Sequence, residues 1–289
     1  MTRLKGVSKL AKHRIAPSGA ERQINQTIIF FMNFLAPIGR TLLRFLEATG
    51  RLALFAAKTI FHTFQGPYYW SQIVRQAIDI GYYSLPVVGL TALFTGMVLA
   101  LQSHSGFARF DAESAIPTVV VLSITRELGP VMAGLMVAGR IGAAIAAELG
   151  TMRVTEQIDA LTTLSTNPFK YLIVPRFVTA TLMMPLLVLI SDIIGVFGGF
   201  LVCVYRLDFN AANYITQTWQ YLEFNDVTSG LWKAATFGMI IALMGCYNGF
   251  NSKGGAQGVG AATTNAVVSS SILILVSNYL LTGILFASK

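Results

Sequence analysis

The stretch Ile80–Leu101, IGYYSLPVVGLTALFTGMVLAL, decides the fold class because it contains no charged side chain. As a helix it is long enough to cross the hydrocarbon core of a bilayer, which takes about 20 residues. Four more apolar blocks follow it along the chain. The sequence therefore predicts an all-α polytopic membrane protein with about five transmembrane helices, at residues 80–101, 115–147, 172–205, 231–250 and 266–287.

The composition of the whole chain supports the same fold class. Of its 289 residues, 54% are hydrophobic and only 12% are charged, whereas a soluble domain usually carries about 25% charged residues. Too few polar side chains remain to cover a water-soluble globule, which argues against a soluble enzyme. The two cysteines, Cys203 and Cys246, lie in apolar runs and show no spacing typical of a metal site or a disulfide framework.

Two of the apolar blocks are longer than one straight span. Residues 115–147 would form a helix of about 50 Å and include Gly129-Pro130, so we expect this block to bend or break. The block 172–205 is similarly long and contains Asp192.

The N-terminal part of the chain is basic, and residues 1–75 hold more than half of the 21 Lys and Arg residues. Residues 1–27 are predicted to be a basic, flexible N-terminus. Residues 28–66 are predicted to be an interfacial amphipathic helical segment, broken near Gly50, because its charged residues share one face. Nucleic-acid binding is the alternative for such an arm, but the spans that follow favour contact with anionic lipid and no nucleic acid.

Lys and Arg residues in the connections predict the orientation in the membrane. The basic arm places the N-terminus in the cytoplasm, and an odd number of spans then places the C-terminus in the periplasm. The loops on their own show only a weak asymmetry: Arg153, Lys170, Arg176 and Lys253 are assigned to the inside, and Arg109, Arg206 and Lys233 to the outside.

The connection between the second and third spans predicts a short two-faced helix at residues 153–166. Thr155 is expected to be its N-cap, Glu156 and Asp159 to lie in its first turn, and Asn167-Pro168 to end it. From the residues alone, this helix is either an interfacial connector or a docking helix for a soluble partner.

The sequence holds no motif for nucleotide or metal chemistry. The pattern G-x-x-x-x-G-K-[ST] is absent, and the glycine-rich stretch 254–260 lacks its Lys-Ser/Thr ending. The histidines His13, His62 and His104 are widely separated. We therefore predict that the chain is not an enzyme and has no metal or cofactor of its own.

The run 126–161, RELGPVMAGLMVAGRIGAAIAAELGTMRVTEQIDAL, resembles the signature of the MlaE (YrbE-type) permeases. Further matches occur at Gly96–Leu99, Asn167-Pro168, Pro175–Phe177 and Gly195–Gly199. The similarity covers about residues 70–287, so residues 67–289 are assigned to a permease domain of this type.

This resemblance implies a homodimeric permease of an ABC transporter that moves phospholipid between the inner membrane and the outer envelope and so serves lipid asymmetry. A separate cytoplasmic ATPase would hold ATP and Mg and bind the coupling helix, which matches residues 153–166. A periplasmic MCE-domain lipid-binding protein would sit on the outside. Phospholipid would be bound as substrate at the dimer interface, and the location would be the bacterial inner membrane.

Candidate site residues follow from the resemblance and from polar side chains inside spans. Arg126 and Glu127 are costly in hydrocarbon, so they form either a structural ion pair or contacts to a lipid headgroup. The last span has Asn278 where some family members carry an acid. The lipid-cavity candidates are Leu99, Gln102, Arg126 and Glu127. The ATPase-coupling candidates are Arg153, Glu156, Gln157, Asp159 and Leu161. Arg140 and Glu148 are expected to form a structural polar network with Arg153.

Two other functions are weighed against the permease. The first is an ion- or proton-coupled secondary transporter that works through Arg126, Glu127 and Asp192. The second is a structural membrane anchor for an envelope complex. The small-xxx-small patterns Gly142-xxx-Ala146 and Gly195-xxx-Gly199 predict close helix packing but no particular partner.

Overall fold

The computed structural model describes residues 19–66, 68–110 and 112–286, with side chains placed from residue 39 onward except for Phe110. The described residues form helices, turns and short connections, and none of them forms a strand. The chain divides into two compact units, residues 1–54 and residues 55–289. The all-α fold class predicted from the sequence is therefore confirmed.

The described part of the first unit consists of α1, Gly19–Thr63, whose last residues belong to the second unit. The helix runs through Gly50 without interruption, so the break predicted there is wrong. A single glycine costs a helix only about 1 kcal/mol, which neighbouring residues can offset. Residues 1–18 of the predicted flexible N-terminus lie outside the described residues, and residues 19–27 belong to α1.

The second unit contains five helical segments that are long and apolar enough to cross a membrane, as predicted. They are Trp70–Phe107, Glu113–Val154, Phe169–Tyr205, Phe224–Phe250 and Gly255–Phe286. The first span comprises α2 (Trp70–Ile80), η2 (Tyr82–Ser84) and α3 (Leu85–Phe107), with η3 (Ala108–Phe110) after it. The third comprises η7 (Phe169–Ile173) and α8 (Val174–Tyr205), the fourth is α10 (Phe224–Phe250) and the fifth α11 (Gly255–Phe286).

The second span is predicted to bend or break, and in the structure it is one continuous segment in which the helix type changes. It runs through η4 (Glu113–Ala115), α4 (Ile116–Ser123), η5 (Ile124–Leu128), α5 (Gly129–Val137), η6 (Ala138–Gly142) and α6 (Ala143–Val154). The segments η5 and η6 are single π-helical turns, and Pro130 falls in the first turn of α5, directly after η5. The wider turn relieves the clash between the proline ring and the preceding turn, so the span continues.

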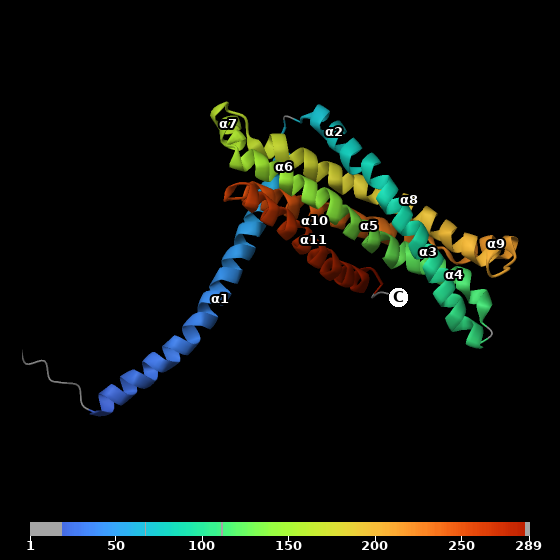
Figure 1. The fold of residues 1–289 in the computed structure, drawn as a ribbon, viewed down its shortest axis with the longest axis horizontal. Coiled ribbons are helices and arrows are strands. Elements are labelled where there is room, and N and C mark those ends of the chain that lie inside the picture. Colours follow the sequence, from blue (N-terminus) through green and yellow to red (C-terminus); the bar gives the residue numbers. More distant parts are fainter. Residues whose placement is uncertain (1–18, 67, 111, 287–289) are drawn as a thin grey trace, which may run out of the picture. The chain divides into compact units, whose positions relative to one another are not determined.

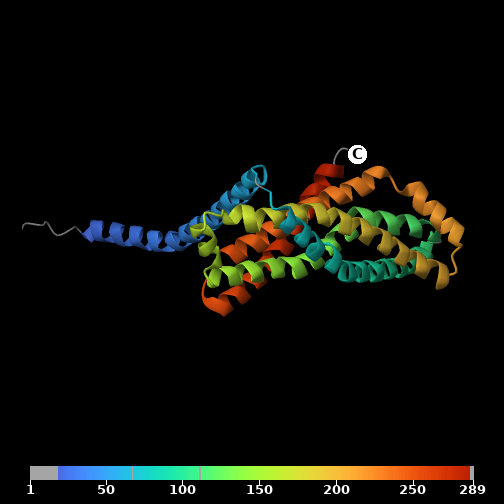
Figure 2. The same ribbon diagram turned by 90° about the horizontal axis from the view of Figure 1, so that it is seen from above.

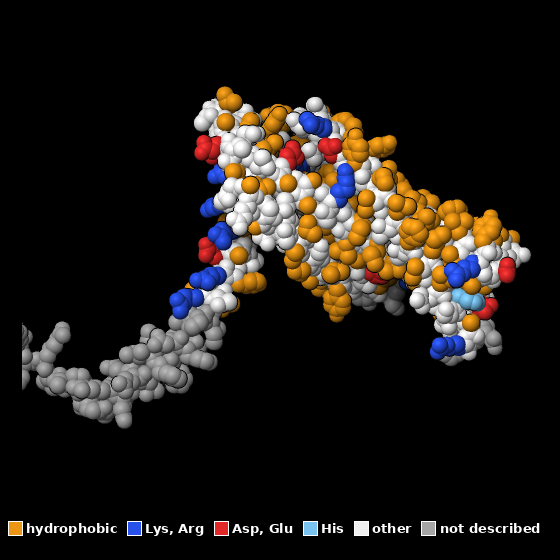
Figure 3. All heavy atoms as spheres, viewed as in Figure 1, with side chains coloured by type: hydrophobic (Ala, Val, Ile, Leu, Met, Phe, Trp, Pro, Cys, Tyr) orange, Lys and Arg blue, Asp and Glu red, His pale blue; other side chains and the backbone are white. Residues whose placement is uncertain are grey.

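Two short helices lie outside the spans. The first, α7 (Gln157–Thr163), follows the second span, and α9 (Ala211–Tyr221) follows the third. Within the second unit, α7 and the start of α2 lie at one end, and α9 lies at the other beside the end of α3 (Figures 1 and 2). We call these the α7 end and the α9 end. On the face drawn in Figure 3, charged side chains gather toward the two ends and hydrophobic ones cover the middle.

Helix α8 is packed closely by α3 on one side and by α10 on another. A Cβ atom on Gly96 of α3 would collide with the carbonyl oxygen of Gly195, and one on Gly238 of α10 would collide with that of Ala180. A Cβ atom on Gly199 would lie 2.8 Å from the Cγ1 methyl group of Val120 on α4. The close packing predicted from Gly195 and Gly199 therefore occurs within the chain, between α8 and the first two spans.

Candidate functional site

Four charged side chains link the π-helical turn η5 to α10. Both Nε and Nη2 of Arg126 lie 2.8 Å from Oδ1 of Asp226, and Nζ of Lys233 lies 2.8 Å from Oε1 of Glu127. Asp226 and Lys233 are about two turns apart on α10, so their side chains project from the same face. We call these four residues the charge quartet, and its formal charges sum to zero.

The charge quartet is buried on the α10 side and open on the η5 side. The side chains of Asp226 and Lys233 are 0% exposed, whereas those of Arg126 and Glu127 are 33% and 37% exposed. Lys233 also donates to the Arg126 carbonyl oxygen and to the Thr282 hydroxyl, both at 2.8 Å, so its three N–H donors are all used. Burial of such charges is tolerated only when they are paired and hydrogen-bonded in this way.

The start of α10 holds Asp226 in place. In a capping box, Oδ2 of Asp226 accepts a hydrogen bond from the backbone N–H of Glu223 at 3.2 Å, while Oδ1 of Asp226 faces Arg126. The positive end of the helix dipole stabilises a carboxylate at this position. Asp226 therefore fixes the guanidinium of Arg126 to a rigid helix end.

Helix α11 completes the shell around Glu127. Asn278 donates its amide N–H to Oε2 of Glu127 at 2.8 Å, and the Thr282 hydroxyl lies 3.0 Å from Oε1. An amide at position 278 therefore supplies a donor where an acid would place a second negative charge beside Glu127. The fifth span is joined to the second through this carboxylate.

Arg126 and Glu127 open onto a cleft of about 500 Å³. The ring of Phe286 lies over the Arg126 guanidinium at 5.0 Å, a cation–π contact, and Lys233 lies 5.9 Å from the same ring. Arginine has five N–H donors, and Asp226 occupies only part of this set. Arg126 can therefore bind a further anionic group in the cleft, which is lined by Leu122, Ser123, Arg126, Glu127, Thr282 and Phe286.

The structure brings together only two of the four lipid-cavity candidates. Arg126 and Glu127 line the cleft side by side. Leu99 lies on α3 and packs, partly buried, against a separate apolar cluster, and Gln102 is exposed toward the α9 end of α3. Neither Leu99 nor Gln102 lines the cleft.

Sequence reasoning missed the partners of Arg126 and Glu127. Lys233 was predicted to lie in an outside loop, and this prediction is wrong because Lys233 is buried in α10. The sequence places the start of this apolar block at residue 231, but the helix begins at Phe224. Asp226 and Lys233 can lie inside it because they pair with Arg126 and Glu127. The sequence signal that could have revealed these partners is the spacing of Asp226 and Lys233 beside an apolar run, since residues two turns apart lie on the same face of a helix.

The predicted coupling helix is shorter than expected, with α7 covering Gln157–Thr163. Thr155 is not its N-cap, because the Thr155 hydroxyl donates to the Thr151 carbonyl oxygen at 2.8 Å and so belongs to the end of α6. Glu156 precedes α7 with φ of +60°, and this left-handed residue makes the turn between the two helices. Asn167 does not end α7 but accepts the N–H of Phe169 at 2.9 Å and so starts η7.

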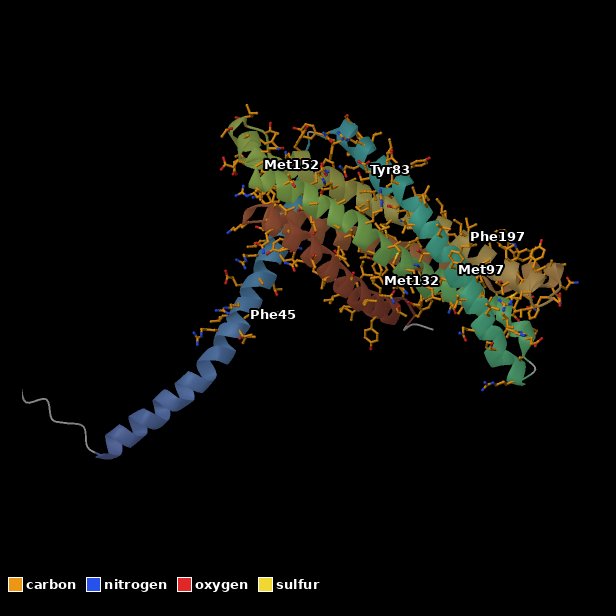
Figure 4. All side chains as sticks on the ribbon, viewed as in Figure 1. Phe45, Tyr83, Met97, Met132, Met152 and Phe197 are labelled. Carbon is orange, nitrogen blue, oxygen red and sulfur yellow. The ribbon has the colours of Figure 1, made fainter. Side chains whose placement is uncertain are left out.

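The coupling candidates form an exposed surface on an anchored helix. Ile158 is buried in the core, and Leu161 packs against it from a partly buried position. Glu156, Gln157 and Asp159 are exposed. Nη1 of Arg153 lies 2.6 Å from Oδ1 of Asp159, which ties α6 to α7. Figure 4 labels Met152, the residue before Arg153, beside α7.

The polar network predicted for Arg140, Glu148 and Arg153 is wrong. Arg140 donates to the Asp79 carbonyl oxygen at 3.0 Å and to the hydroxyl of Ser84 at 2.8 Å. Ser84 follows Tyr83, which Figure 4 labels. Glu148 lies 2.8 Å from Nη2 of Arg176, and Arg153 pairs with Asp159. Their spacing along the second span turns these three side chains to different faces. Each therefore fastens the span to a different element.

The model of the family described as Permease MlaE matches residues 73–284. The chain belongs to the MlaE permease family. It is 60% identical over 254 residues to the probable ABC transporter permease protein RC0129 of Rickettsia conorii, covering 88% of this chain and 98% of that protein.

More distant members of the MlaE family also align over most of their length. The chain is 40% identical over 235 residues to the probable ABC transporter permease protein slr1045 of Synechocystis, covering 81% of this chain and 89% of that protein. It is 32% identical over 262 residues to the intermembrane phospholipid transport system permease protein MlaE of Haemophilus influenzae, covering 89% and 99%. The chain is thus an MlaE-family ABC transporter permease and a multi-pass membrane protein.

The match to the MlaE family contains the candidate site described above. The charge quartet, the cleft residues up to Thr282, and α7 all lie within residues 73–284. Residues 1–72 lie outside the family model, and with them the whole of α1.

Proposed function

We propose that this permease moves phospholipid between the bacterial inner membrane and the outer envelope, with Arg126 binding the phosphate of the lipid. The observation that carries the proposal is the cleft in which a partly exposed, pre-oriented guanidinium adjoins the apolar side chains of Leu122 and Phe286. A phospholipid needs both features, and arginine matches the geometry of a phosphate better than lysine does. The name of the Haemophilus influenzae relative supports this substrate class.

The cleft suits a dimer of this chain. It opens beside α11, whose outer face is apolar and carries the exposed side chains of Ile272, Val276 and Tyr279. A second copy packed on this face would close the cleft and shield the headgroup from hydrocarbon. We therefore propose a homodimer with bound phospholipid as its substrate.

We propose that ATP hydrolysis by a separate cytoplasmic ATPase drives the transport, with ATP and Mg held by that subunit. Its docking site would be α7, which presents Glu156, Gln157 and Asp159. The Arg153–Asp159 pair and buried Ile158 make α7 rigid against α6. Because α6 and η5 belong to one continuous span, a push on α7 would reach Arg126 and Glu127.

The orientation follows from this docking. The α7 end would face the cytoplasm together with the N-terminus, and the α9 end and the C-terminus would face the periplasm. A periplasmic MCE-domain protein would then receive or deliver lipid at the α9 end.

A proton- or ion-coupled mechanism has less support from the contacts. Arg126 and Glu127 are each paired with a residue of α10, so protonation of Glu127 would break its ion pair with the buried Lys233. Asp192, the third residue of this alternative, is buried without a hydrogen-bond partner among the described residues and does not line the cleft with the other two. Lipid transport in proteoliposomes that stops when a proton gradient is dissipated, and continues without ATP, would favour this alternative.

The docking role of α7 is tested by Glu156→Lys. No ion pair involves Glu156 among the described residues, so the substitution reverses an exposed charge without breaking an internal contact. Like charges at an interface cost several kcal/mol, so we expect at least a tenfold loss of ATPase recovered with the tagged permease. The matched control is Asp208→Lys, since Asp208 is also an exposed acid with positive φ but lies beside α9. Equal ATPase recovery with both variants would contradict the docking role.

The phosphate role of Arg126 is tested by Arg126→Lys. Lysine keeps the charge opposite Asp226 but loses the fork that binds two partners at once, so we expect about tenfold weaker crosslinking of a photoactivatable phospholipid. Arg109→Lys, at an exposed arginine toward the α9 end, serves as the control and should crosslink as the parent protein does. Unchanged crosslinking and unchanged transport in Arg126→Lys would refute the assignment.

A further inference from the structure

A small polar pocket lies toward the α7 end, where the first three spans meet, and its volume is about 130 Å³. It shares no lining residue with the cleft beside Arg126. Met152, which Figure 4 labels beside α7, forms part of its wall. Its polar side chains come from α2, α6 and the start of the third span, and they are Gln72, Arg75, Gln76, Glu148, Tyr171 and Arg176.

Arg75 brings an unpaired positive charge to this pocket. Among the described residues, no ion pair or hydrogen bond involves the side chain of Arg75 or of Gln76. The other two charges offset each other, because Nη2 of the buried Arg176 lies 2.8 Å from Oε2 of Glu148. With two arginines and one glutamate, the lining has a formal charge of +1. This charge suits a singly charged anion.

The hydrogen-bond donors of α2 are accessible to such a ligand. Arg75 is exposed, and Gln72 and Gln76 are partly exposed. Their spacing of three and four residues places all three side chains on one face of α2. Gln72 donates one amide N–H to the Tyr171 hydroxyl at 3.2 Å, and its amide has a second N–H. A phosphate group, which has several acceptor oxygens, can accept hydrogen bonds from this face.

The length of the first span indicates that the pocket lies at the level of lipid headgroups. Its 38 residues, Trp70–Phe107, make a helix of about 57 Å, whereas the hydrocarbon core is about 30 Å thick. The uncharged stretch Ile80–Leu101 accounts for the core, so α2 lies outside it. Tyr82 and Tyr83, directly after α2, are 67% and 55% exposed, and exposed tyrosines are typical of the membrane interface.

The outer face of α2 is apolar and adjoins the polar one. Trp70, Val74 and Ile78 follow one another at intervals of four residues, and all three are exposed. At about 100° per residue, Arg75 falls between Ile78 and Gln72 and so borders both faces. Such an amphipathic helix at the interface contacts lipid with its apolar face. A lipid whose chains run along Ile78 toward α3 would therefore bring its phosphate to Arg75.

We propose that this pocket binds the phosphodiester group of one phospholipid from the adjacent leaflet, with Arg75 as the main donor and Gln72 and Gln76 as further donors. The pocket is smaller than the roughly 300–1,000 Å³ of sites that enclose a whole ligand, so it holds the headgroup while the acyl chains stay outside. A free phosphate would use the same donors but would leave the apolar face of α2 unused. The bound lipid would hold α2 against α6 and α8.

The test uses two photoactivatable lipids that differ only in the headgroup. One is a phosphatidylglycerol and the other a diacylglycerol, each with a diazirine in the acyl chain close to the glycerol. The full chain is irradiated with each probe in mild detergent micelles, and crosslinks to α2 are measured by mass spectrometry. Crosslinks to the exposed face of α3, at Leu90, Phe94 and Val98, are the internal reference for general contact with lipid.

We expect phosphatidylglycerol to label α2 about tenfold more than diacylglycerol does, which corresponds to about 1.4 kcal/mol from charge-assisted hydrogen bonds. Arg75→Gln should lower labelling by phosphatidylglycerol to the level of diacylglycerol. This variant should fold, because Arg75 is exposed and makes no ion pair with a described residue. Arg206→Gln removes the same charge at an exposed position toward the α9 end, so it should be labelled as the parent protein is.

Three results would overturn the proposal. The first is equal labelling of α2 in the parent protein by the two probes. The second is labelling by phosphatidylglycerol that survives Arg75→Gln. The third is suppression of this labelling by millimolar inorganic phosphate but not by chloride at the same ionic strength, which would show that the pocket takes the free anion.

The inference rests on the membrane-spanning fold and does not depend on the proposed transport. Arg126→Lys should leave the labelling of α2 unchanged, because Arg126 does not line this pocket. Failure of the phosphate role of Arg126 can therefore be distinguished from failure of the site at Arg75.

Discussion

Substitution of Lys233 by methionine should lower the free energy of unfolding by about 3 kcal/mol. Methionine fills a similar volume but leaves Glu127 without its counter-ion, and removing one member of a buried pair is strongly destabilising. The effect is at the lower end of the usual range because Glu127 is partly exposed and keeps its hydrogen bond from Asn278. Titration with SDS of the protein in mild detergent micelles, followed by circular dichroism, measures the change.

The double variant Glu127→Gln, Lys233→Met distinguishes loss of the ion pair from loss of packing. Removing both charges leaves no uncompensated carboxylate, so we expect the double variant to recover most of the stability lost in Lys233→Met. Lys253→Met is the control, since Lys253 is exposed and its loss should change stability by less than about 0.5 kcal/mol. A double variant as unstable as Lys233→Met would show that Lys233 stabilises the protein through the packing of its aliphatic chain or through its hydrogen bond to Thr282, and not through the ion pair.

These variants also bear on how the site is built. Lys233 reaches Glu127, the Arg126 carbonyl oxygen and Thr282, so it joins three of the five spans at one point. A cleft that binds a phosphate during transport needs a guanidinium whose position is set before the lipid arrives, since preorganisation lowers the cost of binding. We therefore expect Glu127→Gln, Lys233→Met to fold but to crosslink phospholipid less efficiently than the parent protein.

Much of the fold follows from local sequence, because hydropathy along a helix reports directly on the surrounding solvent. The predicted spans coincide with five helical segments, and the charged pair in the middle of the second span was found because it interrupts an apolar run. The helix ends were not predicted. Residues such as Asp79 and Asp226 look like loop residues, but they lie in helices, and Asp226 is neutralised by a partner from another span.

The partners in the site could not be derived in the same way. Glu127 and Lys233 are separated by 106 positions, and helical periodicity specifies one face of one helix but not which neighbour it meets. The same limit explains the network wrongly predicted around Arg140, whose partners lie on the first span. Glycine and proline in the second span predict a bend or a break, but the two π-helical turns that occur there were not predicted, because a π-helical turn leaves no simple pattern in the sequence.

The crossing of α3 and α8 leads to the second large expected effect, in Gly96→Ala. The new methyl group would collide with the carbonyl oxygen of Gly195, and because that atom is backbone, no side-chain rotation can relieve the clash. Overpacking costs about 1–3 kcal/mol where side chains can move, so we expect a loss of about 3 kcal/mol in the free energy of unfolding. The same SDS titration measures it.

Gly106→Ala is the matched control, because Gly106 lies on the same helix with nothing within 4 Å of the added methyl group. Alanine favours a helix over glycine by about 0.5–1 kcal/mol, so Gly106→Ala should be neutral or stabilising. Both variants add the same methyl group to the same helix, and they differ in how close α8 lies to that methyl group. If both changed stability alike, intrinsic helix propensity would explain the result, and α3 and α8 could not cross at Gly96. If only Gly96→Ala is unstable, the contact is as close as described, and the α8 backbone cannot yield there without pressing Gly195 against Ile124 of η5.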